Sequence, residues 1–147
     1  MVGAGAWGTS LALTAARAGR TVRLWAREKE VVESVAAARE NTAFLPGISL
    51  PSSITATGDL SQAVADADAL LIAAPAQFLR ATLVAVAACA QKGMPLVVCA
   101  KGIERGSGEL LTEVLRDEAA NAEPAILSGP SFARDVAKGL PTACGPC

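Results

Sequence analysis

The feature that most constrains the fold of this chain is a cluster of three glycines at its start, in the stretch MVGAGAWGTS. Gly3, Gly5 and Gly8 have the G-x-G-x-x-G spacing of a dinucleotide-binding turn, which follows a buried strand and opens a helix. In such a turn the first glycine permits the tight bend, the second lets the backbone approach a pyrophosphate, and the third lets helix and strand pack closely. The same spacing also arises where glycines serve only helix packing.

Only Met1 and Val2 precede the turn, so we expect the first strand of the sheet to be largely missing. That strand is central in the usual strand order of such folds. We therefore expect a gap, or a stub of Met1 to Gly3, in the middle of the sheet, with neighbouring backbone groups left unpaired. Because buried unpaired N–H and C=O groups are costly, we expect a compromised fold.

Beyond the glycines, the chain alternates between short apolar runs and segments with one apolar helical face. The predicted strands are residues 21–26, 54–58, 67–75, 95–102 and 124–131, and the predicted helices are residues 7–17, 28–40, 59–67, 76–93, 108–120 and 131–139. Strands that are apolar on both faces indicate a parallel sheet covered by helices on both sides. We therefore predict one doubly wound, Rossmann-like α/β dinucleotide-binding domain spanning residues 1–147.

Composition excludes several classes of function. The chain is 52% hydrophobic and 18% charged with a formal net charge of −1, so it has no basic field to attract nucleic acid or an anionic membrane. It has no histidine, which excludes a His-containing triad and a His-ligated metal, and we predict no metal site. We also predict no membrane span and no signal peptide, because no apolar run is long enough and the start lacks a basic segment.

The four cysteines favour a reducing compartment. Cys89 and Cys99 lie inside apolar runs, as the reduced, buried thiols of a cytosolic protein do. Cys144 and Cys147 form a lone C-x-x-C, and a redox or zinc site there would need a helix start or a second ligand pair. We therefore predict a cytoplasmic protein and assign this pair no role.

Two charged residues and one serine stand where predicted strands end, which is where ligands bind in such sheets. Arg27 follows the second strand at the position that reads the adenosine ribose, and its guanidinium favours the 2′-phosphate of NADP without excluding NAD. Lys101 directly follows an apolar strand, where a cation can hold a phosphate or polarise a carbonyl. Ser131 can cap a helix and contact an anion at once. Exposed loop charges and a simple helix cap are the structural alternatives.

Six motifs, taken in order, resemble the NAD(P)-dependent glycerol-3-phosphate dehydrogenases of the bacterial type: GAGAWGT, LWARE, NTAFLPGISLP, AAPAQFLR, AKGIE and SGPSFARDVAKGLPTA. They run from Val2 to Ala143, and FLPG, AKGIE and SGPSFA are jointly specific. The resemblance implies NAD(P)H-dependent reduction of dihydroxyacetone phosphate to sn-glycerol 3-phosphate, which feeds glycerophospholipid synthesis. It also implies an all-helical C-terminal substrate domain, which this chain lacks, and it is compatible with a homodimer of the full-length enzyme.

The resemblance also implies roles for individual residues. The implied cofactor positions are Gly3, Gly5, Ala6, Trp7, Gly8, Arg27, Pro75, Lys101 and Ala133. Among them, Arg27 would lie beside the adenosine ribose and Pro75 under the nicotinamide side. The implied substrate positions are Lys101, Gly129 and Ser131, so Lys101 would touch both cofactor and substrate.

The proton-handling lysine of the family lies beyond the PTA motif, and this chain stops at Cys147. Lys138 occupies a helix-surface position in the family pattern and is not assigned a role. We interpret Glu104 and Asp135 as exposed charges rather than an acid/base pair. The CGPC tail departs from the apolar strand that the family implies after PTA, so its place in the sheet is open.

We therefore expect the isolated chain to be inactive although it carries the cofactor-binding part. Two alternatives remain at this point. One is a non-catalytic fragment that binds NAD(P) without turnover. The other is a related two-domain β-hydroxyacid or ketopantoate-type reductase, which would share the glycine turn without FLPG and SGPSFA.

Overall fold

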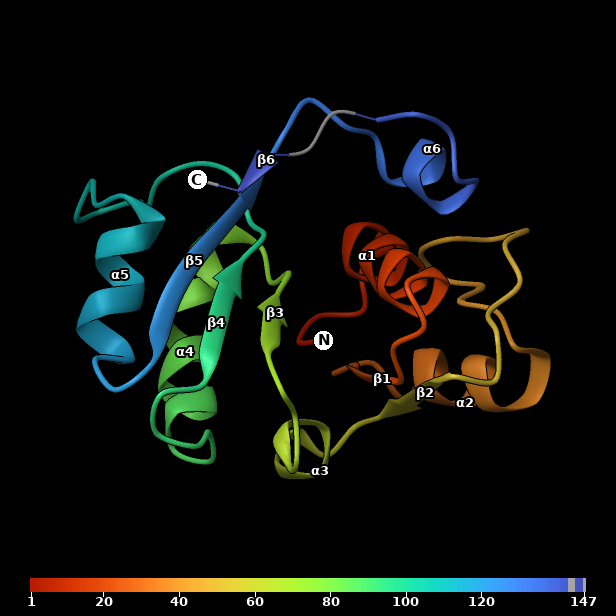
Figure 1. Cartoon of the computed structure of the whole chain (residues 1–147), viewed down its shortest axis with the longest axis horizontal. Coiled ribbons are helices and arrows are strands. Elements are labelled where there is room, and N and C mark those ends of the chain that lie inside the picture. Colours follow the sequence, from red (N-terminus) through yellow and green to blue (C-terminus); the bar gives the residue numbers. More distant parts are fainter. Residues whose placement is uncertain (143–144, 147) are drawn as a thin grey trace.

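The computed structural model describes residues 1–142 and 145–146, in which helices and strands alternate as predicted (Figure 1). The elements in chain order are α1 (Ala6–Arg17), β1 (Val22–Trp25), α2 (Lys29–Ala38), β2 (Ile54–Thr57), α3 (Leu60–Val64), β3 (Leu70–Ile72), the 3₁₀ turn η1 (Ala76–Phe78), α4 (Leu79–Ala87), β4 (Pro95–Val98), α5 (Leu111–Glu118), β5 (Glu123–Ser128), α6 (Ala133–Ala137) and β6 (Gly145–Pro146).

The strands form two hydrogen-bonded groups. β1 and β2 pair in parallel, from Val22 opposite Ile54 to Trp25 opposite Thr57. β3, β4 and β5 lie side by side in parallel, which confirms the doubly wound α/β prediction. β6 pairs antiparallel with β5, so part of the CGPC tail joins the sheet at its edge. An antiparallel edge strand on an otherwise parallel sheet is common.

The stub of Met1 to Gly3 joins the two groups, as predicted from the sequence (Figure 1). Val2 forms parallel bridges to both Trp25 and Ile72, its N–H donating to the Leu71 carbonyl at 2.8 Å. The Trp25 N–H in turn donates to the Met1 carbonyl at 2.8 Å. Beside the stub, the expectation of unpaired neighbours was therefore wrong, because two residues suffice to bridge the central position.

Beneath the stub, the predicted gap is present as an open groove of about 760 Å³. Its lining includes Met1, Arg23, Ala69 and Leu71, so it lies between the first residues of β1 and the residues that lead into β3.

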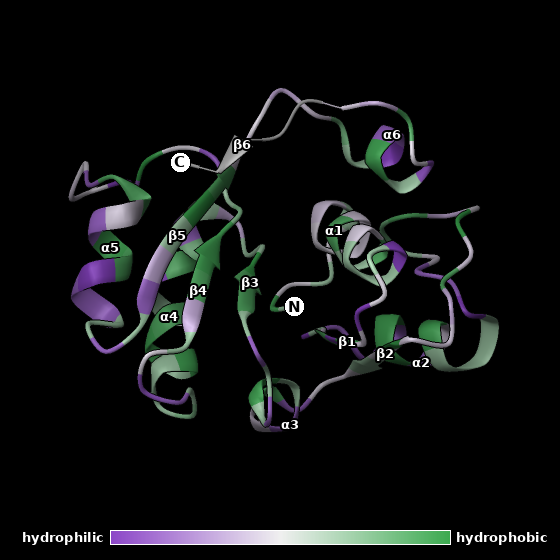
Figure 2. Cartoon of the chain, in the orientation of Figure 1, coloured by the Kyte–Doolittle hydropathy of each residue, from purple (hydrophilic) through white to green (hydrophobic). Residues whose placement is uncertain are grey.

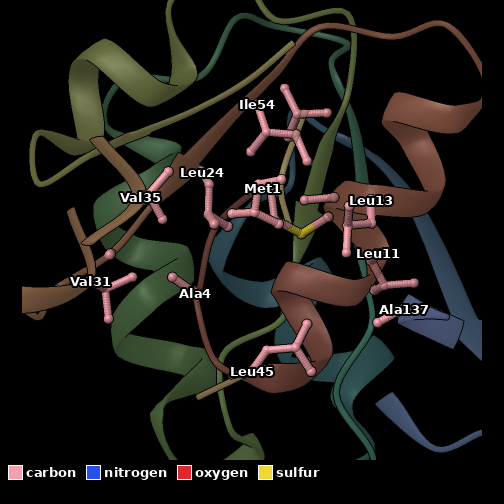
Figure 3. Packing of buried hydrophobic residues seen from close by; sticks show 14 of the residues in the cluster. Met1, Ala4, Leu11, Leu13, Leu24, Val31, Val35, Leu45, Ile54 and Ala137 are labelled. Carbon is pink, nitrogen blue, oxygen red and sulfur yellow. The ribbon is translucent and has the colours of Figure 1, made fainter. Parts of the chain in front are cut away.

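Two apolar clusters lie on opposite faces of the sheet. Met1 belongs to the cluster with α1 and α2, and Val2 to the cluster with α4 and α5, because successive strand residues point to opposite faces. Figure 3 shows part of the first cluster, in which Leu24 of β1 and Leu11 of α1 are both buried. Each fully buried aliphatic side chain contributes about 1.5–3 kcal/mol. In Figure 2 the outer side of α5 is hydrophilic, whereas the side toward β5 is hydrophobic.

Candidate functional site

The three glycines of the opening turn meet three different surroundings. Gly3 has φ of 105°, and a Cβ there would lie 3.0 Å from the backbone carbon of Ala73. A Cβ on Gly8 would lie 1.9 Å from the Gly3 carbonyl oxygen, so helix and turn are in direct contact. A Cβ on Gly5 would meet no atom within 4 Å. The first and third glycines are thus required by the fold, and the second leaves its backbone open to a ligand.

The first turn of α1 presents an uncompensated positive dipole end. Gly5 is its N-cap residue and makes no side-chain capping hydrogen bond, and the first turn contains no acidic residue. The first N–H groups of a helix have no intrahelical partner, and with the dipole they favour an anion. The turn therefore fits the pyrophosphate of a dinucleotide.

A cavity of about 520 Å³ opens in front of this turn. It collects residues that follow β3, β4 and β5, where a doubly wound sheet binds its ligands. Of the positions predicted from the sequence, it brings together Gly5, Ala6, Trp7, Pro75, Lys101, Ser131 and Ala133. The larger groove under Met1 lies at the opposite ends of the strands and contains none of them.

Lys101 links the two halves of the predicted site. Its Nζ donates a hydrogen bond of 2.6 Å to the carbonyl oxygen of Gly129, a predicted substrate position. The same Nζ lies 5.7 Å from the centroid of the Trp7 ring, a predicted cofactor position. Trp7 is held by its own Nε1, which donates to the Cys99 carbonyl at 3.0 Å. The ammonium group is exposed and lies among the residues that would surround both ligands.

Arg27 lies apart from this cavity, on the exposed loop after β1. Its side chain is 75% exposed and makes one ion pair, 3.5 Å from Glu28. An exposed pair of this kind is weak, so the guanidinium remains available to a phosphate. The neighbouring carboxylate of Glu28 is the acid that would favour a ribose hydroxyl instead.

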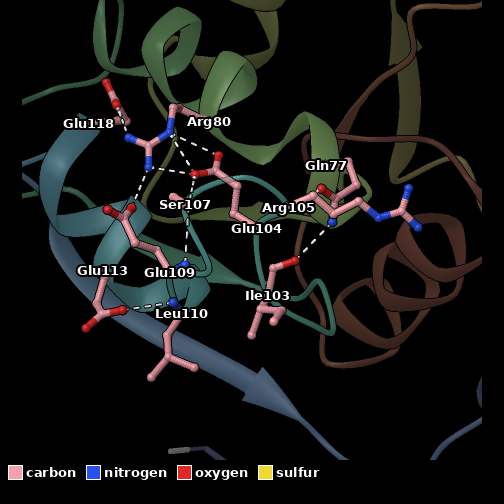
Figure 4. A network of polar contacts seen from close by, with 10 residues as sticks. All are labelled: Gln77, Arg80, Ile103, Glu104, Arg105, Ser107, Glu109, Leu110, Glu113 and Glu118. Atoms are coloured by element: carbon pink, nitrogen blue, oxygen red, sulfur yellow. Dashed lines mark hydrogen bonds and ion pairs between the residues drawn. The ribbon is translucent and has the colours of Figure 1, made fainter.

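The interpretation of Glu104 as an exposed charge was wrong. Its side chain is 15% exposed and accepts hydrogen bonds from Arg80, 3.0 Å to Nε and 2.8 Å to Nη2, and from Ser107 at 2.7 Å (Figure 4). These bonds hold the pKa of Glu104 below its usual range and raise that of Arg80. Arg80 also binds Glu109 and Glu118 at 2.5 Å, so it fastens the loop after Lys101 to α4 and α5. Asp135 is half-buried on α6.

Two residues that hold segments beside the site, Gln77 and Asn41, were not predicted from the sequence. Gln77 of η1 donates to the Ile103 carbonyl and accepts from the Arg105 N–H, both at 2.9 Å (Figure 4). Asn41, which is fully buried, donates to the Ala4 carbonyl inside the glycine turn at 2.8 Å. Two further predictions concern the cysteine pair and the membrane. Cys144 and Cys147 lie outside the described residues. No helix of the described part is long and apolar enough to cross a membrane.

Comparison with known proteins agrees with this geometry. A family described as NAD-dependent glycerol-3-phosphate dehydrogenase N-terminus matches residues 1–145. The chain is 59% identical over 143 residues to glycerol-3-phosphate dehydrogenase [NAD(P)+] of Parvibaculum lavamentivorans, and 54% identical to that of Hyphomonas neptunium. These alignments cover 97% of the chain but only 43% and 42% of the two relatives.

A solved structure shows the same relationship. Glycerol-3-phosphate dehydrogenase from Coxiella burnetii superimposes with a TM-score of 0.92 at 34% identity, over 99% of this chain and 44% of that one. The chain therefore belongs to the NAD-dependent glycerol-3-phosphate dehydrogenase N-terminus family.

Proposed function

We propose that this chain is the cofactor-binding part of an enzyme that reduces dihydroxyacetone phosphate to sn-glycerol 3-phosphate with NADPH or NADH, for glycerophospholipid synthesis. The observation that carries the proposal is the position of Lys101, whose ammonium touches Gly129 and lies over Trp7 at the mouth of one cavity. A single cation between a cofactor turn and a substrate loop suits a reaction that joins the two ligands.

In this proposal the turn and the first N–H groups of α1 bind the pyrophosphate, and Pro75 and Ala133 flank the cofactor. When bound, the nicotinamide supplies the hydride. Lys101 would hold the substrate phosphate or polarise its carbonyl oxygen, on which negative charge develops. The proton that completes the product hydroxyl would come from the family's proton-handling lysine beyond the PTA motif. Gly129 and Ser131 position the substrate beside it. Alignment and charge stabilisation are most of what hydride transfer needs from the protein.

We further propose that NADP is the preferred cofactor, because the exposed Arg27 offers a guanidinium to the 2′-phosphate. A cytoplasmic location is proposed because Cys89 and Cys99 lie inside apolar runs, as the reduced thiols of cytosolic proteins do. By family resemblance, the complete enzyme is proposed to act as a homodimer.

For the 147-residue chain itself we propose cofactor binding without turnover. Its cavity is lined by one lysine, Lys101, and Lys138 lies exposed at the end of α6 outside it. The test is a pair of measurements on the same sample: titration with NADPH, followed by fluorescence, and the NADPH-dependent reduction of dihydroxyacetone phosphate. We expect saturable binding and no oxidation of NADPH. Turnover would show that this chain holds the whole catalytic machinery, and absence of binding would refute the cofactor role.

A further inference from the structure

One fully buried side chain touches the glycine turn from a distant part of the sequence. Asn41 lies in the loop between α2 and β2 and is 0% exposed. Its Nδ2 donates to the Ala4 carbonyl and to the Thr9 hydroxyl oxygen, both at 2.8 Å. A buried amide is stabilised only where its hydrogen bonds are made, so these contacts fix its orientation.

The loop in turn fixes Asn41. Its Oδ1 accepts a hydrogen bond of 3.1 Å from the Phe44 N–H, and its carbonyl accepts one of 2.9 Å from the Leu45 N–H. Leu45 is 3% exposed and belongs to the apolar cluster with α1 (Figure 3). The NTAFLPG stretch is thus a compact turn, anchored in the core, that presents the Asn41 amide to Ala4.

Holding the Ala4 carbonyl also determines where the next N–H points. The peptide bond is planar and trans, so the Ala4 carbonyl and the Gly5 N–H face opposite directions. The carbonyl faces the buried amide, whereas Gly5 lines the cavity of the candidate site. The Gly5 N–H has no hydrogen-bond partner within the described part of the chain. The Gly5 N–H can therefore donate a hydrogen bond to an oxygen atom of a ligand.

We propose that Asn41 is a positioning residue for phosphate binding: by holding the Ala4 carbonyl inward, it aims the Gly5 N–H at the pyrophosphate of the dinucleotide. This inference rests on the proposed cofactor role of the chain. In this proposal the NTAFLPG motif has a function although none of its residues lines the cavity. Through Asn41 it orients the part of the glycine turn that would bind the pyrophosphate.

The test compares Asn41→Ala with Leu45→Ala in the 147-residue chain. Asn41→Ala removes the amide that donates to Ala4 and leaves the longer bond of 3.4 Å from the Thr9 hydroxyl. Leu45→Ala removes apolar packing from the same loop but retains the Asn41 amide. We expect Asn41→Ala to raise the Kd for NADPH about tenfold, and Leu45→Ala to change it much less although it lowers stability. A wild-type Kd in Asn41→Ala, or an equal loss in both variants, would overturn the positioning role.

The NMR chemical shift of the Gly5 backbone amide is a second measurement. A role of Asn41 that is limited to stabilising the loop would leave this chemical shift unchanged. In the free protein we expect this resonance to shift in Asn41→Ala and to stay in place in Leu45→Ala. In the wild-type chain it should move again on titration with NADPH or inorganic pyrophosphate. A Gly5 resonance unchanged by Asn41→Ala refutes the positioning role alone. A wild-type chain that binds NADPH nowhere refutes the proposed function and the phosphate role with it.

Discussion

At the scale of single residues, Lys101 is the side chain on which the proposed chemistry depends. Its ammonium is exposed and, within the described residues, makes one hydrogen bond, to the Gly129 backbone carbonyl, so the fold has little need of it. In the complete enzyme we expect Lys101→Ala to lower kcat/KM by about 10²–10³-fold. The free energy of unfolding should change by less than about 0.5 kcal/mol, as for other surface changes. Steady-state kinetics and urea denaturation measure the two quantities.

Lys92→Ala is the matched control for this change, because Lys92 is an exposed lysine outside the cavity. It should leave both quantities unaltered. Equal kinetics for Lys101→Ala and the wild type would remove Lys101 from the reaction.

Arg27 tests the proposed choice between the two cofactors. Replacing its guanidinium by a carboxylate removes the partner of the 2′-phosphate and adds an acceptor for a ribose hydroxyl. We expect Arg27→Asp to shift the ratio of the NADPH and NADH dissociation constants by about tenfold or more toward NADH. Arg20→Asp makes the same charge change at the other end of β1 and should not alter the ratio. An unchanged ratio in Arg27→Asp would show that this residue does not read the 2′-phosphate.

At the scale of elements, the loop after β4 is held by ion pairs rather than by apolar packing. Glu104 accepts from Arg80 and Ser107, and Glu109 and Glu118 share the same guanidinium (Figure 4). A carboxylate whose pKa is lowered on folding adds stability above its ordinary pKa and loses it as the pH falls through the lowered value. The loop should therefore loosen in acid.

We expect Glu104→Gln to destabilise the chain at pH 7 and to cost progressively less as the pH falls below about 4, the ordinary range of a glutamate. Urea denaturation of both proteins at pH 7 and at pH 3.5 gives the comparison. Glu33→Gln serves as control, since the Glu33 side chain is 62% exposed and its one ion pair among the described residues is with Lys29 on the same helix. A difference between wild type and Glu104→Gln that is constant with pH would contradict the role of this carboxylate.

The elements also show what the sequence can and cannot predict. Short runs rich in apolar and β-branched residues located every strand from β1 to β5, although β1 alternates buried with half-buried positions and β5 has no fully buried residue. The helix predicted over residues 76–93 is instead η1 and the shorter α4, which ends at Ala87. Its alanine-rich pattern continues past that end, and the turn that follows is fixed by a bond from the Gly93 N–H to the Asn121 carbonyl.

The candidate site was likewise predictable from the sequence only in part. Glycine spacing and strand ends predicted Gly5, Lys101 and Ser131 of the cavity lining, because in a doubly wound sheet those ends converge. The other predicted lining positions came from the family resemblance: Ala6, Trp7, Pro75 and Ala133. The contacts of Asn41 with Ala4 and of Arg80 with Glu118 join residues 37 and 38 positions apart. Nothing in their local sequence marks such partners, since their pairing exists only once the sheet and its loops are assembled.

At the scale of the whole molecule, the short central stub leaves an open place in the sheet. N–H groups alternate in direction along a strand: the Val22 N–H donates to the Ser53 carbonyl, just before β2, whereas the Trp25 N–H donates to the Met1 carbonyl. By the same alternation the Arg23 and Leu71 N–H groups face the groove under Met1. Burial also lowers the pKa of the Met1 ammonium from 8.0 to about 6.

Extending the chain before Met1 by four residues, with Val-Ile next to Met1, should fill this groove with two buried side chains. We expect the free energy of unfolding to rise by about 3 kcal/mol or more. An amine whose pKa falls on folding costs stability as the pH drops from 8 to 6, and the extension removes that amine and hence this dependence. An extension with Pro-Pro in place of Val-Ile lacks the N–H donors and should not stabilise. Equal stability of the two extended chains would show that no strand forms.

Gly5→Val shows whether the glycine turn of this chain binds a dinucleotide. Gly5 has φ of −65°, and a Cβ there would meet no protein atom within 4 Å, so the fold should keep its stability. The added methyl groups would occupy the space through which the backbone approaches the pyrophosphate. Titration with NADPH should show saturable binding to the wild-type chain and none to a folded Gly5→Val. Binding of equal affinity in both proteins would contradict the claim.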